Sequence, residues 1–176
     1  MPLYTFENVR PKIDPSAYIA PTATIVGNVT IGKDSSVWFN CVVRGDADTI
    51  IIGEETNIQD LTMVHADQGK PTIVGNKVTV GHHCVLHGCI IEDNCLIGMG
   101  SIILNGAKIG RGSVVAAGAV VTEDTVVPSS SLIAGIPGKV KRTFEENSMG
   151  MGKLGARAYM ELAKSYSSSD KLELIG

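Results

Sequence analysis

The sequence repeats with a period of six residues, and this period restricts the fold more than any other feature. An aliphatic residue returns at almost every sixth position between residues 13 and 133. An α-helix turns every ~3.6 residues and gains nothing from such a period. A strand places residues i and i−2 on one face, so six residues suffice for a short strand and a turn. The aliphatic positions are Ile13, Ile19, Ile25, Ile31, Val37, Val43, Ile52, Ile58, Val64, Val74, Val80, Leu86, Ile91, Ile97, Ile103, Ile109, Val115, Val121, Val127 and Ile133.

Three such units make a triangular coil, and stacked coils make a parallel β-helix with hydrogen bonds between coils ~4.8 Å apart. The residue two before each aliphatic position is Ala, Ser, Thr, Val or Cys, except at Pro11 and Ile50. Each strand would therefore point one large and one small side chain inward. The twenty aliphatic positions make six to seven coils. We predict an all-β parallel β-helix over residues 1–140, interrupted by an insertion at residues 66–71.

The sequence beyond the repeat predicts an α-helix. Residues 134–140 contain Pro and Gly, which stop a strand. Residues 143–146 match a capping box that opens a helix. We predict that residues 141–176 form a C-terminal helix and tail packed on the coil. An apolar stripe at the spacing of one helix face is formed by Leu154, Ala158 and Leu162.

Composition and charge exclude several classes of function. The formal net charge of −3 shows no basic excess, so we expect no nucleic-acid partner. No apolar run reaches the ~20 residues that span a membrane, so we expect no membrane partner. The N-terminus lacks the basic-then-apolar pattern of a signal peptide. We therefore expect a cytoplasmic protein with reduced thiols.

The register of the repeat also accounts for the cysteines. All four lie two residues before an aliphatic position, in the small inward slot, where cysteine acts as a compact apolar side chain. We therefore expect no metal site at these residues. They are Cys41, Cys84, Cys89 and Cys95.

The histidines are few and clustered. His82, His83 and His87 lie close together, and His65 precedes them. Neutral imidazole is the commonest metal ligand, and three imidazoles leave a fourth zinc position open for water. Their spacing matches neither a zinc finger nor a zincin, so spacing alone leaves polar surface residues as an equal alternative. The register of the repeat favours the metal site.

Counting by coils places Arg44, His65 and His87 in one outward column on successive coils. His65 and His87 are then about one coil spacing apart, a distance from which both can bind one metal ion. This column predicts two ligands from one chain.

His82 falls on the next face of the coil, above Asp60 and beside Gln59. A rigid triangular coil cannot bring His82 round to the other two ligands of its own chain. A neighbouring chain can supply it, and a threefold ring does so at every interface. For His83 an exposed turn without a role is the favoured interpretation.

The motifs that contain these residues resemble those of a known family. The similarity to the γ-class carbonic anhydrases covers nearly the whole coil and, more weakly, the helix. It implies a left-handed β-helix and a homotrimer with one metal ion at each subunit interface. Zinc is the expected ion, although Fe²⁺ or Co²⁺ also suits three histidines and water. The matching residues are Arg44-Gly45-Asp46, Asn57-Ile58-Gln59-Asp60, His65, and Gly81-His82 followed by His87.

The resemblance also implies a role for each matching residue. His65 and His87 of one subunit, with His82 of the next, correspond to the metal ligands. Arg44 and Asp46 correspond to an ion pair between subunits, and a plain interface salt bridge is an alternative interpretation of that pair. Gln59 and Asp60 correspond to residues that position the hydroxide nucleophile and bicarbonate, and Tyr159 corresponds to an active-site tyrosine common in the bacterial subgroup.

The sequence departs from the family archetype where a proton leaves the site. Ala47 stands in place of a shuttle glutamate, and the acidic loop is shortened to residues 67–70. The ligands favour reversible hydration of carbon dioxide, whereas proton export is in doubt. Two other interpretations stay open: a CoA-dependent acyl- or acetyltransferase on the same coil, and a metal-binding trimer without turnover.

We expect the purified protein to be a trimer, because a monomer would leave Arg44, Asp46 and the histidines on an open coil face. Light scattering should give about three times the chain mass of 18.5 kDa. A stable monomer at the chain mass would contradict the shared site.

Overall fold

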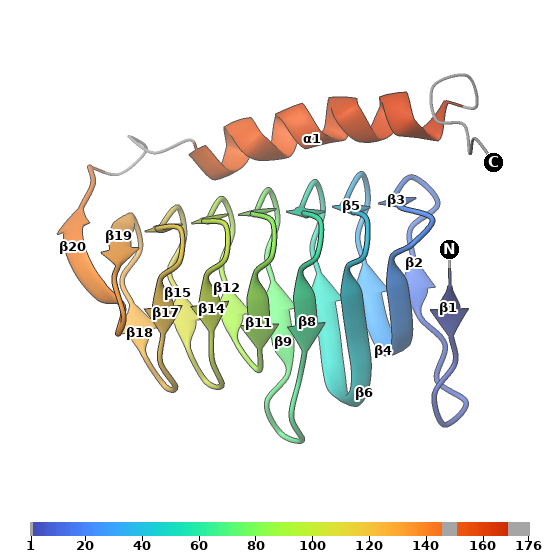
Figure 1. Cartoon of the computed structure of the whole chain (residues 1–176), viewed down its shortest axis with the longest axis horizontal. Helices are drawn as coiled ribbons and strands as arrows, with labels where there is room; N and C mark the ends of the chain where they lie inside the picture. Colours follow the sequence, from blue (N-terminus) through green and yellow to red (C-terminus); the bar gives the residue numbers. More distant parts are fainter. Residues whose placement is uncertain (1, 146–150, 169–176) are drawn as a thin grey trace.

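A computed structural model of the chain describes residues 2–145 and 151–168. It is a stack of triangular coils with one long helix lying along it (Figure 1). The strands are β1 Leu3–Tyr4, β2 Lys12–Ile13, β3 Tyr18–Ile19, β4 Thr24–Ile31, β5 Ser36–Val37, β6 Val42–Ile52, β7 Asn57–Ile58, β8 Met63–His65, β9 Thr72–Val74, β10 Thr79–Val80, β11 Val85–His87, β12 Ile90–Ile91, β13 Leu96–Ile97, β14 Ile102–Ile103, β15 Lys108–Ile109, β16 Val114–Val115, β17 Val120–Val121, β18 Val126–Val127, β19 Ser131–Ala134 and β20 Lys139–Thr143.

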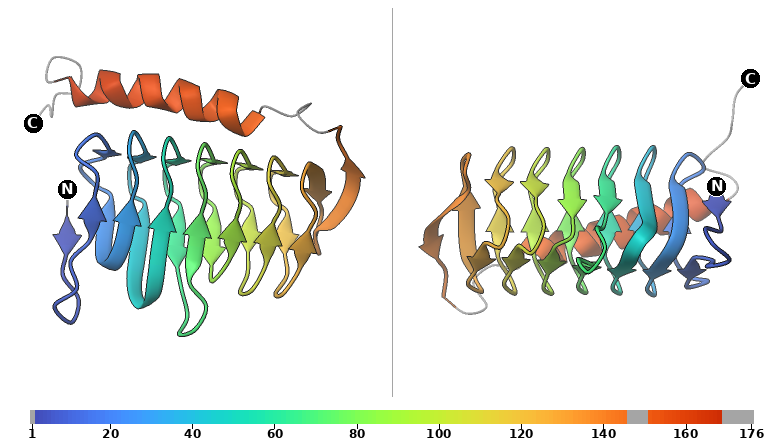
Figure 2. Two further views of the ribbon diagram at one scale, coloured as in Figure 1. Left: turned by 180° about the vertical axis from the view of Figure 1, so that it is seen from behind. Right: turned by 90° about the horizontal axis from the view of Figure 1, so that it is seen from below.

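The strands pair in parallel from coil to coil, which confirms the predicted parallel β-helix. One sheet runs β20-β19-β16-β13-β10-β7-β5-β3, and the strands of the other two faces form a second sheet. The long strand β6 joins these two faces because it pairs with both β8 and β9. Within the described residues, strand β19 pairs with β20 in the antiparallel direction. The coils stack side by side in every view (Figure 2).

The core is the inside of the coil. Nineteen of the twenty predicted aliphatic positions are buried, and Ile13 on the first coil is partly buried. Burial of one such side chain contributes about 2 kcal/mol, so the ladder supplies most of the stabilisation available to a chain with few aromatic residues. The four cysteines are buried and free, as expected from the small inward slot.

The C-terminal helix differs from the prediction in its start and in its buried face. Helix α1 spans Met151–Ser167. Residue Thr143 ends strand β20 and is not a helix cap, and the predicted boundary at residue 140 falls inside that strand. The proposed partner in the capping box, Glu146, lies outside the described residues. Strand pairing therefore continues past the Pro- and Gly-containing segment.

The predicted apolar stripe of α1 faces away from the coil: Leu154 and Leu162 are exposed, as is Ala158. The buried positions are Gly152, Ala156 and Ala163. The helix approaches so closely that a Cβ atom on Gly152 would lie 2.3 Å from the carbonyl oxygen of Asn94. Small residues on the inner face, rather than large apolar ones, make this contact.

Aromatic side chains fill the remaining space between α1 and the coil. The ring of Trp38 lies 5.2 Å from that of Tyr159 and 5.1 Å from that of Tyr166. Edge-to-face pairs of this kind add ~0.5–1.5 kcal/mol each to the energy of burial. They fix α1 along the coil, and with it the position of Tyr159. The described residues contain no helix with the length and apolarity needed to cross a membrane.

The close approach of α1 to the coil predicts that Gly155→Ala lowers the stability of the protein, the opposite of its usual effect in a helix. In an exposed helix interior this change stabilises by about 1 kcal/mol. Here the new Cβ atom would lie 2.4 Å from Oγ1 of Thr79. We expect the free energy of unfolding to fall by about 1–3 kcal/mol, measured by denaturant titration. Lys153→Ala, at an exposed position of the same helix, is the control and should change it by less than about 0.5 kcal/mol. A gain in stability for Gly155→Ala would contradict the close docking.

Candidate metal centre

The pairing of β6, β8 and β11 aligns Arg44, His65 and His87 on successive coils, in the column that the sequence predicts. The two imidazoles meet edge to face, with Nδ1 of His65 3.0 Å from Nε2 of His87. Their side chains are mostly covered. The coil thus holds two potential ligand atoms at a separation that one metal ion can bridge.

Acceptor groups hold the far side of each ring. Oδ1 of Asp46 lies 3.0 Å from Nε2 of His65, and Arg44 donates a hydrogen bond to Oδ2 of Asp46. On the other ring, Nδ1 of His87 lies 2.8 Å from Oδ1 of Asn105. These contacts orient both imidazoles toward each other.

The separation of the two facing nitrogens suits a proton or a metal ion between them. An ionised carboxylate only accepts hydrogen bonds, so the proton of neutral His65 lies on Nε2, toward Asp46, and Nδ1 presents a lone pair. Partial burial raises the pKa of Asp46, but hydrogen bonds from Arg44 and His65 outweigh it and hold that pKa below its ordinary value. Two lone pairs at 3.0 Å repel unless a proton or a metal ion lies between them.

A carboxylate lies next to the pair. Oδ1 of Asp67 is 3.9 Å from Nε2 of His87. Ligand atoms of His65, Asp67 and His87 all lie within 4.8 Å of one another, and within residues 2–145 and 151–168 this is the group that could hold a metal ion. The sequence reasoning noted Asp67 as part of a short loop and gave it no role at the metal.

A second set of residues gathers on the neighbouring face. Nδ1 of His82 lies 2.9 Å from Oδ2 of Asp60, and the hydroxyl of Tyr159 on α1 lies 3.5 Å from Nε2 of His82. Burial first, and the negative charge of Asp60 second, raise the pKa of Tyr159. Gln59 is buried and donates to Oδ1 of Asn57 at 3.0 Å.

This second set borders a cavity of about 360 Å³, lined by Gln59, His82, Met99 and Tyr159 among others. The predicted site residues therefore form two groups, and His82 does not belong to the group of His65. One group contains Gln59, Asp60, His82 and Tyr159, and the other contains Arg44, Asp46, His65 and His87. His83 is exposed in a turn with φ 59°.

Sequence reasoning missed Asn105. It lies one coil above Gly88, the residue after His87, so counting by coils gives its place near His87 but not the hydrogen bond between them. Arg44 and Asp46 contact each other within this chain, and the ion pair between subunits that the resemblance implies stays a prediction.

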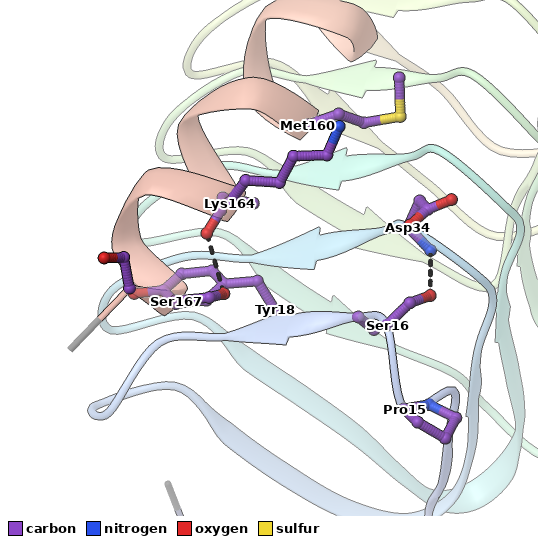
Figure 3. Close-up of a pocket in the computed structure, with 10 residues that line it drawn as sticks. Pro15, Ser16, Tyr18, Asp34, Met160, Lys164 and Ser167 are labelled. Atoms are coloured by element: carbon purple, nitrogen blue, oxygen red, sulfur yellow. Dashed lines mark hydrogen bonds between the residues drawn. The ribbon is translucent and has the colours of Figure 1, made fainter.

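Another cavity, of about 490 Å³, lies between the C-terminal end of α1 and the first coils (Figure 3). Its lining includes Ser16, Tyr18, Asp34 and Lys164. None of the predicted site residues borders it. Its size therefore does not identify it as the centre of the chemistry.

Comparisons with known proteins agree with the coil of six-residue repeats. Two family profiles match: bacterial transferase hexapeptide (six repeats) at residues 88–123 and the hexapeptide repeat of succinyl-transferase at residues 71–103. A protein of Methanocaldococcus jannaschii named "Probable carbonic anhydrase" is 55% identical over 89% of this chain and 98% of its own length. "Gamma carbonic anhydrase 2, mitochondrial" of Arabidopsis thaliana is 40% identical over 91% of this chain, which spans 60% of that longer protein.

A solved structure of another protein has the same fold. The hexapeptide transferase family protein of Anaplasma phagocytophilum matches 94% of this chain and 98% of its own, with a TM-score of 0.89 and 41% identity. The fold and the repeats place the chain among the left-handed β-helix proteins built from hexapeptide repeats. Within that class it belongs to the γ-carbonic anhydrase-like family, as the resemblance implied.

The buried cysteines should not contribute to metal binding. Burial raises the pKa of Cys89 to about 12, so its thiol stays protonated at neutral pH and supplies no thiolate. Cys84→Ala and Cys89→Ala should each keep the metal content of the parent protein, measured by elemental analysis. Each should lower stability by about 1–2 kcal/mol through a small cavity. Loss of metal in either folded variant would contradict the inward register of these residues.

Proposed function

We propose that the protein is a γ-class carbonic anhydrase that hydrates carbon dioxide to bicarbonate at a zinc site shared between subunits of a cytoplasmic homotrimer. The observation that carries this proposal is the division of the ligands between two faces. His65 and His87 face each other on one face of the coil. His82 lies on the neighbouring face, in contact with Asp60 and Tyr159. In a threefold ring, the face of one subunit that carries His82 would meet the face of the next that carries His65 and His87.

The residues present fit such an ion. Two neutral imidazoles offer lone pairs toward one point, and Asp46 and Asn105 hold the opposite nitrogens. Partners of this kind orient metal-binding histidines and raise their basicity. A zinc ion held there would supply a nucleophile near neutral pH by lowering the pKa of a coordinated water. Fe²⁺ or Co²⁺ suits the same ligands.

The remaining residues would bind and orient. Asp60 accepts from Nδ1 of His82, so the lone pair of that ring lies on Nε2, which faces the Tyr159 hydroxyl at 3.5 Å and would be the atom offered to the metal. Gln59, buried against Asn57, would orient the attacking oxygen. Arg44 is half-exposed beside the histidines, where it would attract the bicarbonate product, although its bond to Asp46 already uses part of its charge.

Water and carbon dioxide give bicarbonate and one proton, and that proton has to leave. Ala47 carries no titratable group at the position where the family archetype has its shuttle. We therefore propose that proton release limits turnover and that small buffer molecules accelerate it. A hydration rate independent of buffer concentration would argue against this step as the limit.

Acyl transfer is the second candidate, and one contact favours it. His82 and Asp60 form a histidine–carboxylate pair beside a cavity of about 360 Å³, as a general base for a hydroxyl or amine acceptor would require. This chemistry needs no metal. Metal analysis therefore separates it from the hydratase, and a stopped-flow hydration assay separates the hydratase from a trimer that binds metal without turnover.

Two variants mixed together test the shared site. His82→Ala and His87→Ala should each bind zinc weakly alone, because every interface lacks a ligand. After joint unfolding and refolding, a His82→Ala chain offers His65 and His87 to a neighbour that still has His82. About one quarter of the interfaces regain all three ligands if the chains combine at random. Zinc content and hydration rate should recover in that proportion.

The control is each variant unfolded and refolded alone, which should recover nothing. Mass spectrometry of the intact assemblies establishes that mixed trimers have formed. Mixed trimers without recovered zinc would overturn the division of ligands between two chains.

A further inference from the structure

Asn105 contacts two residues of the metal centre from the coil above. It lies in the turn after β14, and its amide oxygen is 2.8 Å from Nδ1 of His87. Its amide nitrogen donates to Oδ2 of Asp67 at 2.8 Å. One uncharged side chain therefore joins a histidine of the centre to the carboxylate beside it.

The carboxylate of Asp67 sets the orientation of each group in this series of hydrogen bonds. Oδ2 of Asp67 only accepts, so the NH₂ group of Asn105 must face Asp67 and its oxygen must face His87. That oxygen also only accepts, so His87 carries its proton on Nδ1. Its Nε2 then presents a lone pair toward His65. Asn105 selects for His87 the tautomer that binds a cation.

The backbone around Asn105 is shaped for this contact. Gly88 has φ 57°, and a Cβ atom on it would lie 2.1 Å from Oδ1 of Asn105. Any larger residue at position 88 would push the amide away from His87. Two backbone bonds between coils hold the turn, one from Asp124 to the carbonyl of Asn105 and one from Gly106 to the carbonyl of Gly88.

We propose that Asn105 is a positioning residue of the metal centre, which fixes the tautomer and ring orientation of His87. The inference rests on the proposed function because it requires a metal ion between His65 and His87. Asn105 itself does not touch the ion.

Titration of the metal-free protein with Co²⁺, followed by visible absorption, tests the proposal without an activity assay. Asn105→Ala should weaken Co²⁺ binding by about 10- to 100-fold and alter the absorption band of the bound ion. Asn76→Ala is the matched control. Asn76 also sits in a turn of the coil, accepts a bond from the backbone of Glu54 at 2.8 Å, and faces a glycine, Gly53, on the coil below. It should bind Co²⁺ like the parent protein.

A double variant separates positioning from general loss of structure. Asn105→Asp combined with Asp67→Asn keeps the net charge and keeps both hydrogen bonds, with the amide and the carboxylate exchanged. It should bind Co²⁺ within about fivefold of the parent. The melting temperatures of all variants are measured alongside.

Unchanged Co²⁺ affinity in Asn105→Ala would overturn the role of Asn105. So would a folded double variant that binds as weakly as Asn105→Ala, because its acceptor for His87 is intact. Failure of the parent protein itself to bind Co²⁺ is a different result, since it would overturn the proposed metal site.

Discussion

Backbone hydrogen bonds between successive coils determine where every functional side chain of the coil lies. Gln59 donates to Val80 of the next coil, and Met63 donates to Cys84. These bonds allow no slippage, because a shift of one residue would turn each inward aliphatic side chain toward solvent. The alignment of His65 with His87 follows from the same pairing. The core and the metal centre therefore depend on one register.

This explains which parts of the molecule could be predicted from the sequence. A period of six residues specifies coil, inward face and register together, so the column containing His65 and His87 follows from counting. Helix α1 has no such repeat. Propensity counts Gly152 and Gly155 against a helix, but in the structure they let α1 approach the coil. The outward stripe through Leu154 was therefore mistaken for the buried face.

Side-chain contacts between coils lie beyond what counting can predict. The bond from His87 to Asn105 depends on the rotamers of two polar residues and on the space left by Gly88. The bond from Asp67 to Asn105 depends on how an insertion folds back over the coil. A periodic pattern carries information on which face a residue occupies, and none on which neighbour its polar atoms meet.

The triangular cross-section has a thermodynamic consequence for the proposed centre. Neighbouring faces of a coil point in different directions, and the closed core prevents their side chains from converging. His82 and the His65–His87 pair can then share an ion only across two chains. In the proposed trimer, an ion held by all three histidines would bind more tightly than to the His65–His87 pair of one chain, and it would shift the equilibrium toward assembly by that difference in binding free energy. The rigidity that keeps His82 away from the other two histidines of its own chain would thus couple metal binding to assembly.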